Sequence, residues 1–191
     1  MINKEERREK ILDSALDVFS QNGYYKSKIE DIAKEAGIGK GTVYEYFESK
    51  KNLFQELVIY TLDRYFEDIY KIIEQEGLRN RLLAYAFYHG ESINRHMDMM
   101  ESLPKKNDIF SSKIKLYIKE FRQKVFILLE DILKEAINRG EVREDLDINI
   151  ASFMILGTIN QYYAEEIFLN DKNVYDVDHK KIVDFLVESM L

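Results

Sequence analysis

The sequence predicts an all-α protein, because apolar residues recur at helical spacing along most of the chain and residues that break helices are scarce. The 191 residues include one proline and 8 glycines, and several of the glycines directly follow an apolar stripe. Hydrophobic residues make up 46% of the chain and charged residues 33%, the balance of a soluble helical protein. No apolar run approaches the roughly 18 residues of a membrane-spanning helix.

The first helix is predicted over Lys4–Gln21. Its apolar residues fall at positions i, i+4, i+7 and i+8, which place them on one face: Ile11, Ala15, Val18 and Phe19. Gly23 follows, and a glycine at such a position commonly ends a helix. We expect this helix to hold the next two helices together, and we expect Tyr24 to pack in the small core that they form.

Two short helices joined by a glycine-rich turn are predicted between Ser27 and Phe47. The first has one apolar stripe at i, i+3, i+4 and i+7, made by Ile29, Ile32, Ala33 and Ala36. Val43 and Phe47 mark the inner face of the second, and Gly37-Ile38-Gly39 supplies the turn. This is the arrangement of helix-turn-helix DNA-binding proteins, whose second helix lies in the major groove. An ordinary helical hairpin in a bundle has the same spacing, so spacing alone leaves both interpretations open.

The outward residues of the second helix suit contact with DNA. They offer one cation and three hydroxyl groups, on Lys40, Thr42, Tyr44 and Tyr46. Gly41 has no side chain, so the backbone there can approach a phosphate or a base edge closely. The unpaired N–H groups at the start of the helix also attract phosphate. Glu45 would repel phosphate but can accept a hydrogen bond from a cytosine amine.

Four blocks of residues occur in order between Ile11 and Leu57: A-x-x-x-F-x-x-x-G-Y, I-x-x-I-A-x-x-A-G, K-G-T-x-Y-x-Y-F and S-K-x-x-L. This segment resembles the DNA-binding domain of the TetR family of bacterial repressors. Gly39 departs from the family's pattern, which usually has Ser or Thr there, and Ser27 stands where Thr is usual. Glycine is still an acceptable N-cap residue, and Ser27 keeps a hydroxyl that can cap the helix preceding the recognition helix.

The candidates for DNA contact follow from the outward positions and the resemblance together: Ser27, Lys28, Lys40, Gly41, Thr42, Tyr44, Glu45, Tyr46 and Lys50. The net charge of −7 argues only weakly against this assignment. Residues 1–51 contain 10 basic and 10 acidic side chains, so the excess acid lies in the rest of the chain, which need not touch DNA. Lysines gathered on one face of this neutral segment would make salt-dependent phosphate contacts.

A long helix is predicted from Ser49 to Glu76, because its apolar pattern meets no breaker before Gly77. At 1.5 Å per residue this helix is roughly 40 Å long. Its beginning belongs to the DNA-binding head and its end to the unit that follows, so it can carry a tilt from one to the other. The resemblance implies a helix-turn-helix domain at residues 1–48 and a helical effector-binding and dimerisation domain at residues 49–191.

The second domain is predicted to contain further helices at residues 78–95, 97–103, 111–138, 147–170 and 178–191, with a loop at 104–108. The last two long helices are apolar on more than one face, so they must be buried or shared with another subunit. In TetR-like proteins the corresponding helices form a four-helix dimer interface, although a monomer core would explain the same pattern. The interface candidates are Ile150, Phe153, Met154, Gly157, Gln161, Ile182, Phe185 and Leu186.

The second domain also carries many of the 13 tyrosines and 11 phenylalanines of the chain. Apolar walls with a few hydroxyl or amide groups are typical of a small-molecule pocket. The ligand-binding candidates are Phe66, Tyr85, Tyr88, His89, Tyr117, Phe121 and Tyr162. Each of them has the alternative of filling the core with its polar group turned to solvent.

Catalysis and metal binding are not predicted. The histidines are His89, His96 and His179, and none lies in a metal-binding spacing. The chain has no cysteine, which excludes disulfides, thiolate metal sites and a cysteine nucleophile and fits a reducing cytoplasm. The charged segment Met1–Arg8 leads straight into a helix, so we expect no secretion signal. We expect no catalytic residue, no metal and no cofactor.

The resemblance therefore implies a cytoplasmic, homodimeric, ligand-responsive transcriptional repressor that is not membrane-bound. It would bind a near-palindromic operator in double-stranded DNA and be released by a small apolar or amphipathic effector. A transcriptional activator or co-regulator on the same fold is the alternative.

Overall fold

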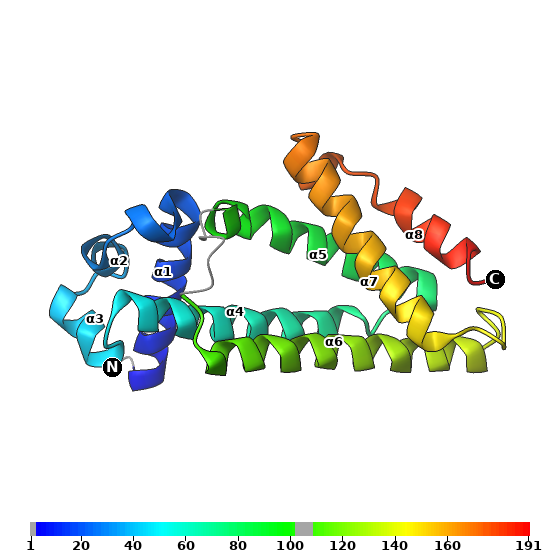
Figure 1. Cartoon of the computed structure of the whole chain (residues 1–191), viewed down its shortest axis with the longest axis horizontal. Coiled ribbons are helices and arrows are strands. Elements are labelled where there is room, and N and C mark those ends of the chain that lie inside the picture. Colours follow the sequence, from blue (N-terminus) through cyan, green and yellow to red (C-terminus); the bar gives the residue numbers. More distant parts are fainter. Residues whose placement is uncertain (1–2, 102–108) are drawn as a thin grey trace. The chain divides into compact units, whose positions relative to one another are not determined.

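The computed structural model describes residues 3–101 and 109–191, with the backbone alone for residues 96–101, and its regular elements in these ranges are all helices (Figure 1). The eight α-helices are α1 (Lys4–Lys26), α2 (Ile29–Glu35), α3 (Lys40–Tyr46), α4 (Lys50–Ile72), α5 (Leu78–Glu101), α6 (Ser112–Asn138), α7 (Ile148–Ala164) and α8 (His179–Glu188). A π-helical segment, Glu165–Leu169, continues α7, and a 3₁₀ turn, Val174–Asp176, precedes α8. The all-α prediction is confirmed.

The chain forms two compact units, and three helices contribute to both. The first unit contains Met1–Arg64 and Arg95–Ile118, and the second contains Tyr65–Asn94 and Lys119–Leu191. The divisions thus fall inside α4, α5 and α6. The predicted domain boundary between residues 48 and 49 stays a prediction.

The core of the first unit joins the first four helices. α1 contributes Ile11 and Phe19, α2 contributes Ile32, and α3 contributes Val43, all of them fully buried. The ring of Phe54 on α4 meets Phe19 edge-on, with 5.4 Å between ring centroids. The apolar stripes predicted for the three N-terminal helices are therefore the surfaces that pack together.

Gly23 interrupts α1 at the predicted helix end. Its φ of 70° lies in the left-handed region, where a glycine has no Cβ to clash, and one further helical turn leads to Lys26. Tyr24 in that turn packs on Phe19 and Phe54, with ring centroids 5.7 and 4.8 Å away. The prediction that Tyr24 joins the small core is confirmed.

Several predicted helix ends differ from the structure, and two of the differences concern α4 and α5. α4 ends at Ile72 instead of Glu76, and the chain turns through Gly77, whose φ is 79°. α5 continues to Glu101 instead of ending at Arg95, because no breaker interrupts the helix-forming residues there. The separate helix predicted at 97–103 is therefore wrong over 97–101, and its last residues and the predicted loop 104–108 lie outside the described residues.

In the second unit, α7 packs against α5 and α8. α7 buries one stripe at i, i+4, i+8 and i+12: Ala151, Ile155, Ile159 and Tyr163. The Tyr163 ring lies directly on the backbone of α5 at Gly90, where an added Cβ would overlap the ring carbons. α7 and α8 lie side by side (Figure 1), and α8 buries Val183 and Leu186. Over the described ranges, no helix combines the length and the apolar composition needed to cross a membrane.

Candidate functional site

The α2–α3 pair is held in a fixed geometry by its turn. Gly37 has a φ of 68°, and the Ile38 N–H donates to the Ala33 carbonyl at 2.9 Å, which closes the C-terminus of α2. Gly39 is the N-cap residue of α3, as the resemblance implies, and the Thr42 N–H donates to its carbonyl at 3.0 Å. Because Ile32 and Val43 are fully buried on facing sides, the opposite side of α3 is turned to solvent.

The solvent face of α3 carries most of the predicted DNA contacts. Lys40, Gly41, Tyr44 and Glu45 are exposed, and Thr42 is partly exposed. A Cβ added at Gly41 would meet no heavy atom within 4 Å, so another molecule can approach the backbone there. Tyr46 is less available, because it is partly buried against the core and its ring lies 6.4 Å from that of Phe47.

Lys40 at the start of α3 is ion-paired with α2. Its Nζ lies 2.5 Å from Oε1 of Glu30 and 5.8 Å from the ring centroid of Tyr44. This pairing raises the pKa of Lys40 and lowers that of Glu30. Lys28, also exposed, contributes to the lower pKa of Glu30.

Lys50 at the start of α4 is anchored to the end of α1. Its Nζ donates to the Tyr25 carbonyl at 3.2 Å and lies 4.6 Å from the ring centroid of Tyr24. Partial burial lowers the pKa of Lys50. An ammonium group has three N–H donors, so an amine held by one carbonyl can still donate to a phosphate.

Ser27, a predicted DNA contact, does not turn its side chain to solvent. Its side chain is 2% exposed, and its hydroxyl donates to the carbonyl of Gly23 at 2.7 Å. The hydroxyl therefore closes the end of α1 and does not cap α2. The Asp31 carboxylate does that, by accepting from the Lys28 N–H at 3.1 Å.

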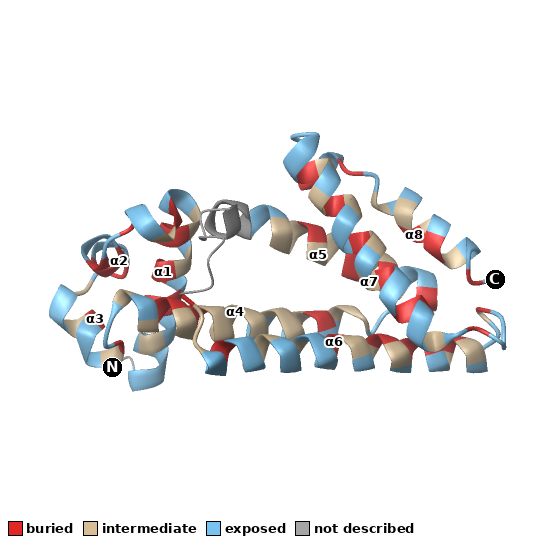
Figure 2. Cartoon of the chain, viewed as in Figure 1, coloured by how far each residue is buried: buried red, intermediate tan, exposed pale blue. Residues whose placement is uncertain are grey.

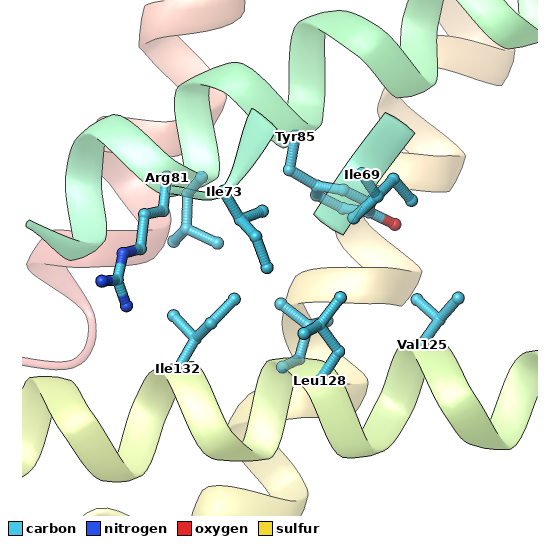
Figure 3. A pocket seen from close by; sticks show the side chains of 9 residues that line it. Ile69, Ile73, Arg81, Tyr85, Val125, Leu128 and Ile132 are labelled. Carbon is cyan, nitrogen blue, oxygen red and sulfur yellow. The ribbon is translucent and has the colours of Figure 1, made fainter. Parts of the chain in front are cut away.

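The second unit contains a small cavity of about 10 Å³ between α4, α5 and α6, room for about one water molecule. Its lining residues are Ile69, Ile73, Arg81, Leu82, Tyr85, Val125, Leu128, Leu129 and Ile132. Figure 3 shows the side chains of α4 and α5 facing those of α6 across the gap, with the Arg81 guanidinium at one end. Of the predicted ligand-binding residues, Tyr85 alone belongs to this lining.

A cluster of aromatic residues around His89 includes Tyr85 of the cavity lining. The His89 ring stacks on Tyr85 at 5.7 Å, and its Nδ1 lies 2.6 Å from the hydroxyl of Tyr65. Tyr88 packs on Tyr65 and donates to Asp68 at 2.8 Å, and Phe121 packs on Tyr65 at 5.9 Å. Burial lowers the pKa of His89 and raises that of Tyr85 to about 12, so both groups are neutral at pH 7.

Three predicted ligand-binding residues lie elsewhere. Tyr117 belongs to the first unit, where its hydroxyl donates to Asp63. The Phe66 ring lies under the Lys124 ammonium at 5.9 Å. Tyr162 donates to the Asp178 carbonyl at 3.2 Å and borders a groove on α7 and α8. For these residues aromatic content predicted a pocket wall, whereas the structure gives each another contact.

Tyr65 and Tyr163 were missed as members of the cluster. Tyr163 is fully buried, and its hydroxyl lies 2.5 Å from Nδ1 of His179 on α8. The signal was present in the sequence, because Ile155, Ile159 and Tyr163 fall at i, i+4 and i+8, whereas Tyr162 falls beside that stripe.

The outward face of α7 and α8 is apolar. Phe153 and Phe185 are each 63% exposed, and Ile150 and Met154 are also exposed. Figure 2 shows exposed and buried segments along both helices. A groove of about 530 Å³ runs over this face, lined by Phe153, Met154, Gly157, Thr158, Gln161, Tyr162, Glu165 and Ile182. Leu186 was predicted to lie in the dimer interface, but it is 1% exposed and packs inside its own subunit. Its side chain is therefore not available to a second subunit.

Among the described side chains, no group of three or more His, Asp or Glu residues is placed to hold a metal ion. Several polar groups of the second unit are instead paired with one another. The tyrosine hydroxyls bond to His89, His179 and Asp68.

Comparisons with known proteins agree with this arrangement. Residues 11–57 match the family model of the bacterial regulatory proteins of the tetR family, and residues 62–188 match that of the C-terminal region of YsiA-like proteins. The fatty acid metabolism regulator protein of Bacillus subtilis is 28% identical over 184 residues, covering 93% of this chain and 91% of the relative.

Two solved structures share the fold. The transcriptional regulator FadR from Bacillus subtilis, in complex with stearoyl-CoA, superposes with a TM-score of 0.74 at 24% identity, over 96% of this chain and 99% of that one. The fatty acid degradation regulator FadR from Bacillus halodurans superposes with a TM-score of 0.77 at 22% identity, over 97% of this chain and 96% of that one.

Proposed function

Because this chain belongs to the TetR family of bacterial transcriptional regulators, we propose that it represses transcription as a homodimer and leaves its operator when it binds a long-chain acyl effector. The family regulates transcription and is not a family of enzymes. The proposed site of action is the cytoplasm, where a bacterial chromosome lies.

The observation that carries the DNA-binding part is the solvent face of α3. Lys40, Thr42, Tyr44 and Glu45 project from a helix whose other side is fixed by Val43 in the core. In the proposed complex these residues contact base edges and nearby phosphates, and Lys28 and Lys50 contact the phosphates on either side. In the dimer, the two α3 helices would lie roughly 34–36 Å apart, one turn of DNA, and read a near-palindromic site.

The homodimer is supported by the outward face of α7 and α8. Exposed apolar side chains such as Phe153 and Phe185 gain free energy when another apolar surface covers them, at about 25 cal/mol per Å². A two-fold axis would bring the same apolar face of a second copy against this one, so that each face covers the other. The groove beside Gly157 offers space for a helix of the other subunit.

The effector class is supported by the cavity and by the relatives. The cavity is apolar except for Tyr85 and Arg81, which suits a hydrocarbon chain with one polar end. A chain cannot enter a volume of about 10 Å³ without separating helices, so binding would favour a second arrangement of α4, α5 and α6. Shifting a two-state equilibrium from 1:99 to 99:1 takes about 5.5 kcal/mol of differential affinity.

The test has two stages. Selection of DNA fragments from a random library by the full-length protein should enrich one near-palindromic sequence, and the absence of any enriched sequence would contradict DNA recognition. Palmitoyl-CoA, added to the complex with that sequence in a gel-shift titration, should then release the DNA, whereas free coenzyme A should not. Retention of the complex at saturating palmitoyl-CoA would contradict the effector assignment alone.

A further inference from the structure

Arg81 is the charged residue of the cavity lining. It lies in the first turn of α5, its side chain is 15% exposed, and its guanidinium ends the row of apolar side chains in Figure 3. Nε donates to the Gln75 carbonyl at 2.8 Å, and Nη1 lies 2.5 Å from Oε2 of Glu135 on α6. The pair therefore connects two of the helices between which the cavity lies.

Glu135 has a second cation beside it. Its other oxygen, Oε1, lies 2.5 Å from Nη2 of Arg139, one helical turn further along α6. Arg81 and Arg139 together hold the pKa of the Glu135 carboxyl below its usual range. Because Glu135 is 40% exposed and keeps Arg139, it can give up Arg81 without becoming an unpaired buried charge.

We propose that Arg81 recognises an oxyanion group of the effector and that Glu135 is its internal competitor. The inference rests on the proposed function, because it assigns a polar end to the acyl effector of the same cavity. The hydrocarbon chain lies among the apolar residues of α4, α5 and α6, and the oxyanion takes the place of the Glu135 carboxylate on Nη1 of Arg81. Carboxylate and phosphate oxygens both match the planar N–H donors of arginine.

The exchange also explains how so small a cavity can widen. The Arg81–Glu135 pair joins α5 to α6, and the cavity between them has room for about one water. An entering chain must part these helices, which lengthens the pair. The oxyanion then supplies the hydrogen bonds that Arg81 loses, while Glu135 retains Arg139.

The experiment compares three probes on five proteins by calorimetric titration. The probes are palmitate, with its carboxylate next to the chain, palmitoyl-CoA, with its phosphates farther off, and hexadecanol, which is uncharged. The proteins are the wild type, Arg81→Met, Glu135→Gln, the double variant Arg81→Met, Glu135→Gln and the matched control Arg79→Met. Arg79 lies on the same helix but pairs with Asp184, with Nη2 2.6 Å from Oδ1, and does not line the cavity.

Arg81→Met should weaken binding of an anionic probe about tenfold or more and leave hexadecanol within about twofold. Glu135→Gln should strengthen binding of the same anionic probe several-fold, and the double variant should behave as Arg81→Met, because Glu135 acts through Arg81. Arg79→Met should match the wild type. A larger effect on palmitate than on palmitoyl-CoA assigns Arg81 to a carboxylate, and the reverse assigns it to a phosphate.

Equal effects on charged and uncharged probes, or no effect of Arg81→Met and Glu135→Gln, would overturn the inference while leaving the proposed function intact. If the wild type bound none of the probes, both would fail. Thermal unfolding of each variant confirms that the fold is retained. Glu135→Gln keeps Arg81 in place, so it tests the competition even if Arg81→Met unfolds.

Discussion

The outward faces of α3 and α7 have opposite chemistry, although each helix buries an apolar stripe on its other side. α3 buries Val43 and exposes Lys40 and Glu45, whereas α7 buries Ile155 and exposes Phe153. The polar groups on α3 can form hydrogen bonds with water when no DNA is bound, so that face suits a partner that binds reversibly. Covering the apolar groups on α7 lowers the free energy by removing apolar surface from water, so that face suits a lasting subunit contact.

The strongest test of this contrast places a charge on the α7 face. Phe153→Glu should convert the proposed dimer to a monomer, because a two-fold interface on this face would bury two unpaired carboxylates at a cost of several kcal/mol. Sedimentation velocity at micromolar concentration measures the mass. Tyr70→Glu, which changes an exposed aromatic residue of α4, is the matched control and should remain dimeric. A Phe153→Glu protein of unchanged mass would show that the face is not the interface.

A second test compares two glycines. Gly90→Ala should lower the free energy of unfolding by about 1–3 kcal/mol, because its Cβ would overlap the Tyr163 ring. In the monomeric Phe153→Glu background, Gly157→Ala should raise that free energy by about 0.5–1 kcal/mol, because it favours the helix and meets no neighbour within the subunit. Urea unfolding measures both, and equal destabilisation by the two changes would refute the packing described.

The polar face of α3 should respond by a smaller amount. Lys40→Ala should weaken operator binding by about 1 kcal/mol, roughly fivefold, and reduce the slope of log affinity against log salt by about one. Fluorescence anisotropy at several salt concentrations measures both quantities. Lys119→Ala, an exposed lysine of the second unit, should leave them unchanged. If Lys40→Ala and Lys119→Ala had the same affinity and the same salt slope, Lys40 would not contact DNA.

The smallest expected effect is on pH dependence. Burial lowers the pKa of His89 and of His179, with Asp178 and Glu91 opposing the shift at His179. The stability that these neutral histidines contribute is present above the unfolded pKa of about 6.5 and is lost as the pH falls through it toward the folded values. Between pH 7.5 and 5.5, the free energy of unfolding should fall more in the wild type than in the His89→Gln, His179→Gln double variant. A steeper fall in the double variant would contradict this.

The contrast between the faces also explains what could be predicted from the sequence. The helix-turn-helix segment was predictable because its packing is local: Ile29, Ile32 and Val43 lie within 15 residues of one another and pack as their spacing indicates. Ser27 was the exception, since a hydroxyl near a helix end can bond to the helix before it or the one after it. Spacing does not choose between them.

The cavity of the second unit was harder to predict because its walls come from three separate helices. Ile69, Leu82 and Leu128 meet across long stretches of chain, and each looks like an ordinary core residue in the sequence. Aromatic side chains were a poor guide, since Tyr117 and Phe66 carry the same chemistry as Tyr85 but contact other groups. Arg81 and Glu135 form an ion pair although they are 54 positions apart, and no local sequence pattern predicts it.

Tyr163 has a consequence for the quantitative behaviour of a dimer. Its ring rests on Gly90 of α5, and its hydroxyl bonds to His179 of α8, so one side chain joins a helix of the cavity wall to both helices of the apolar face. In a dimer built on that face, occupation of one subunit would alter the packing that its neighbour meets. Effector binding would then have a Hill coefficient different from one. Loss of the Tyr163 hydroxyl would bring the Hill coefficient back toward one, the value for independent sites.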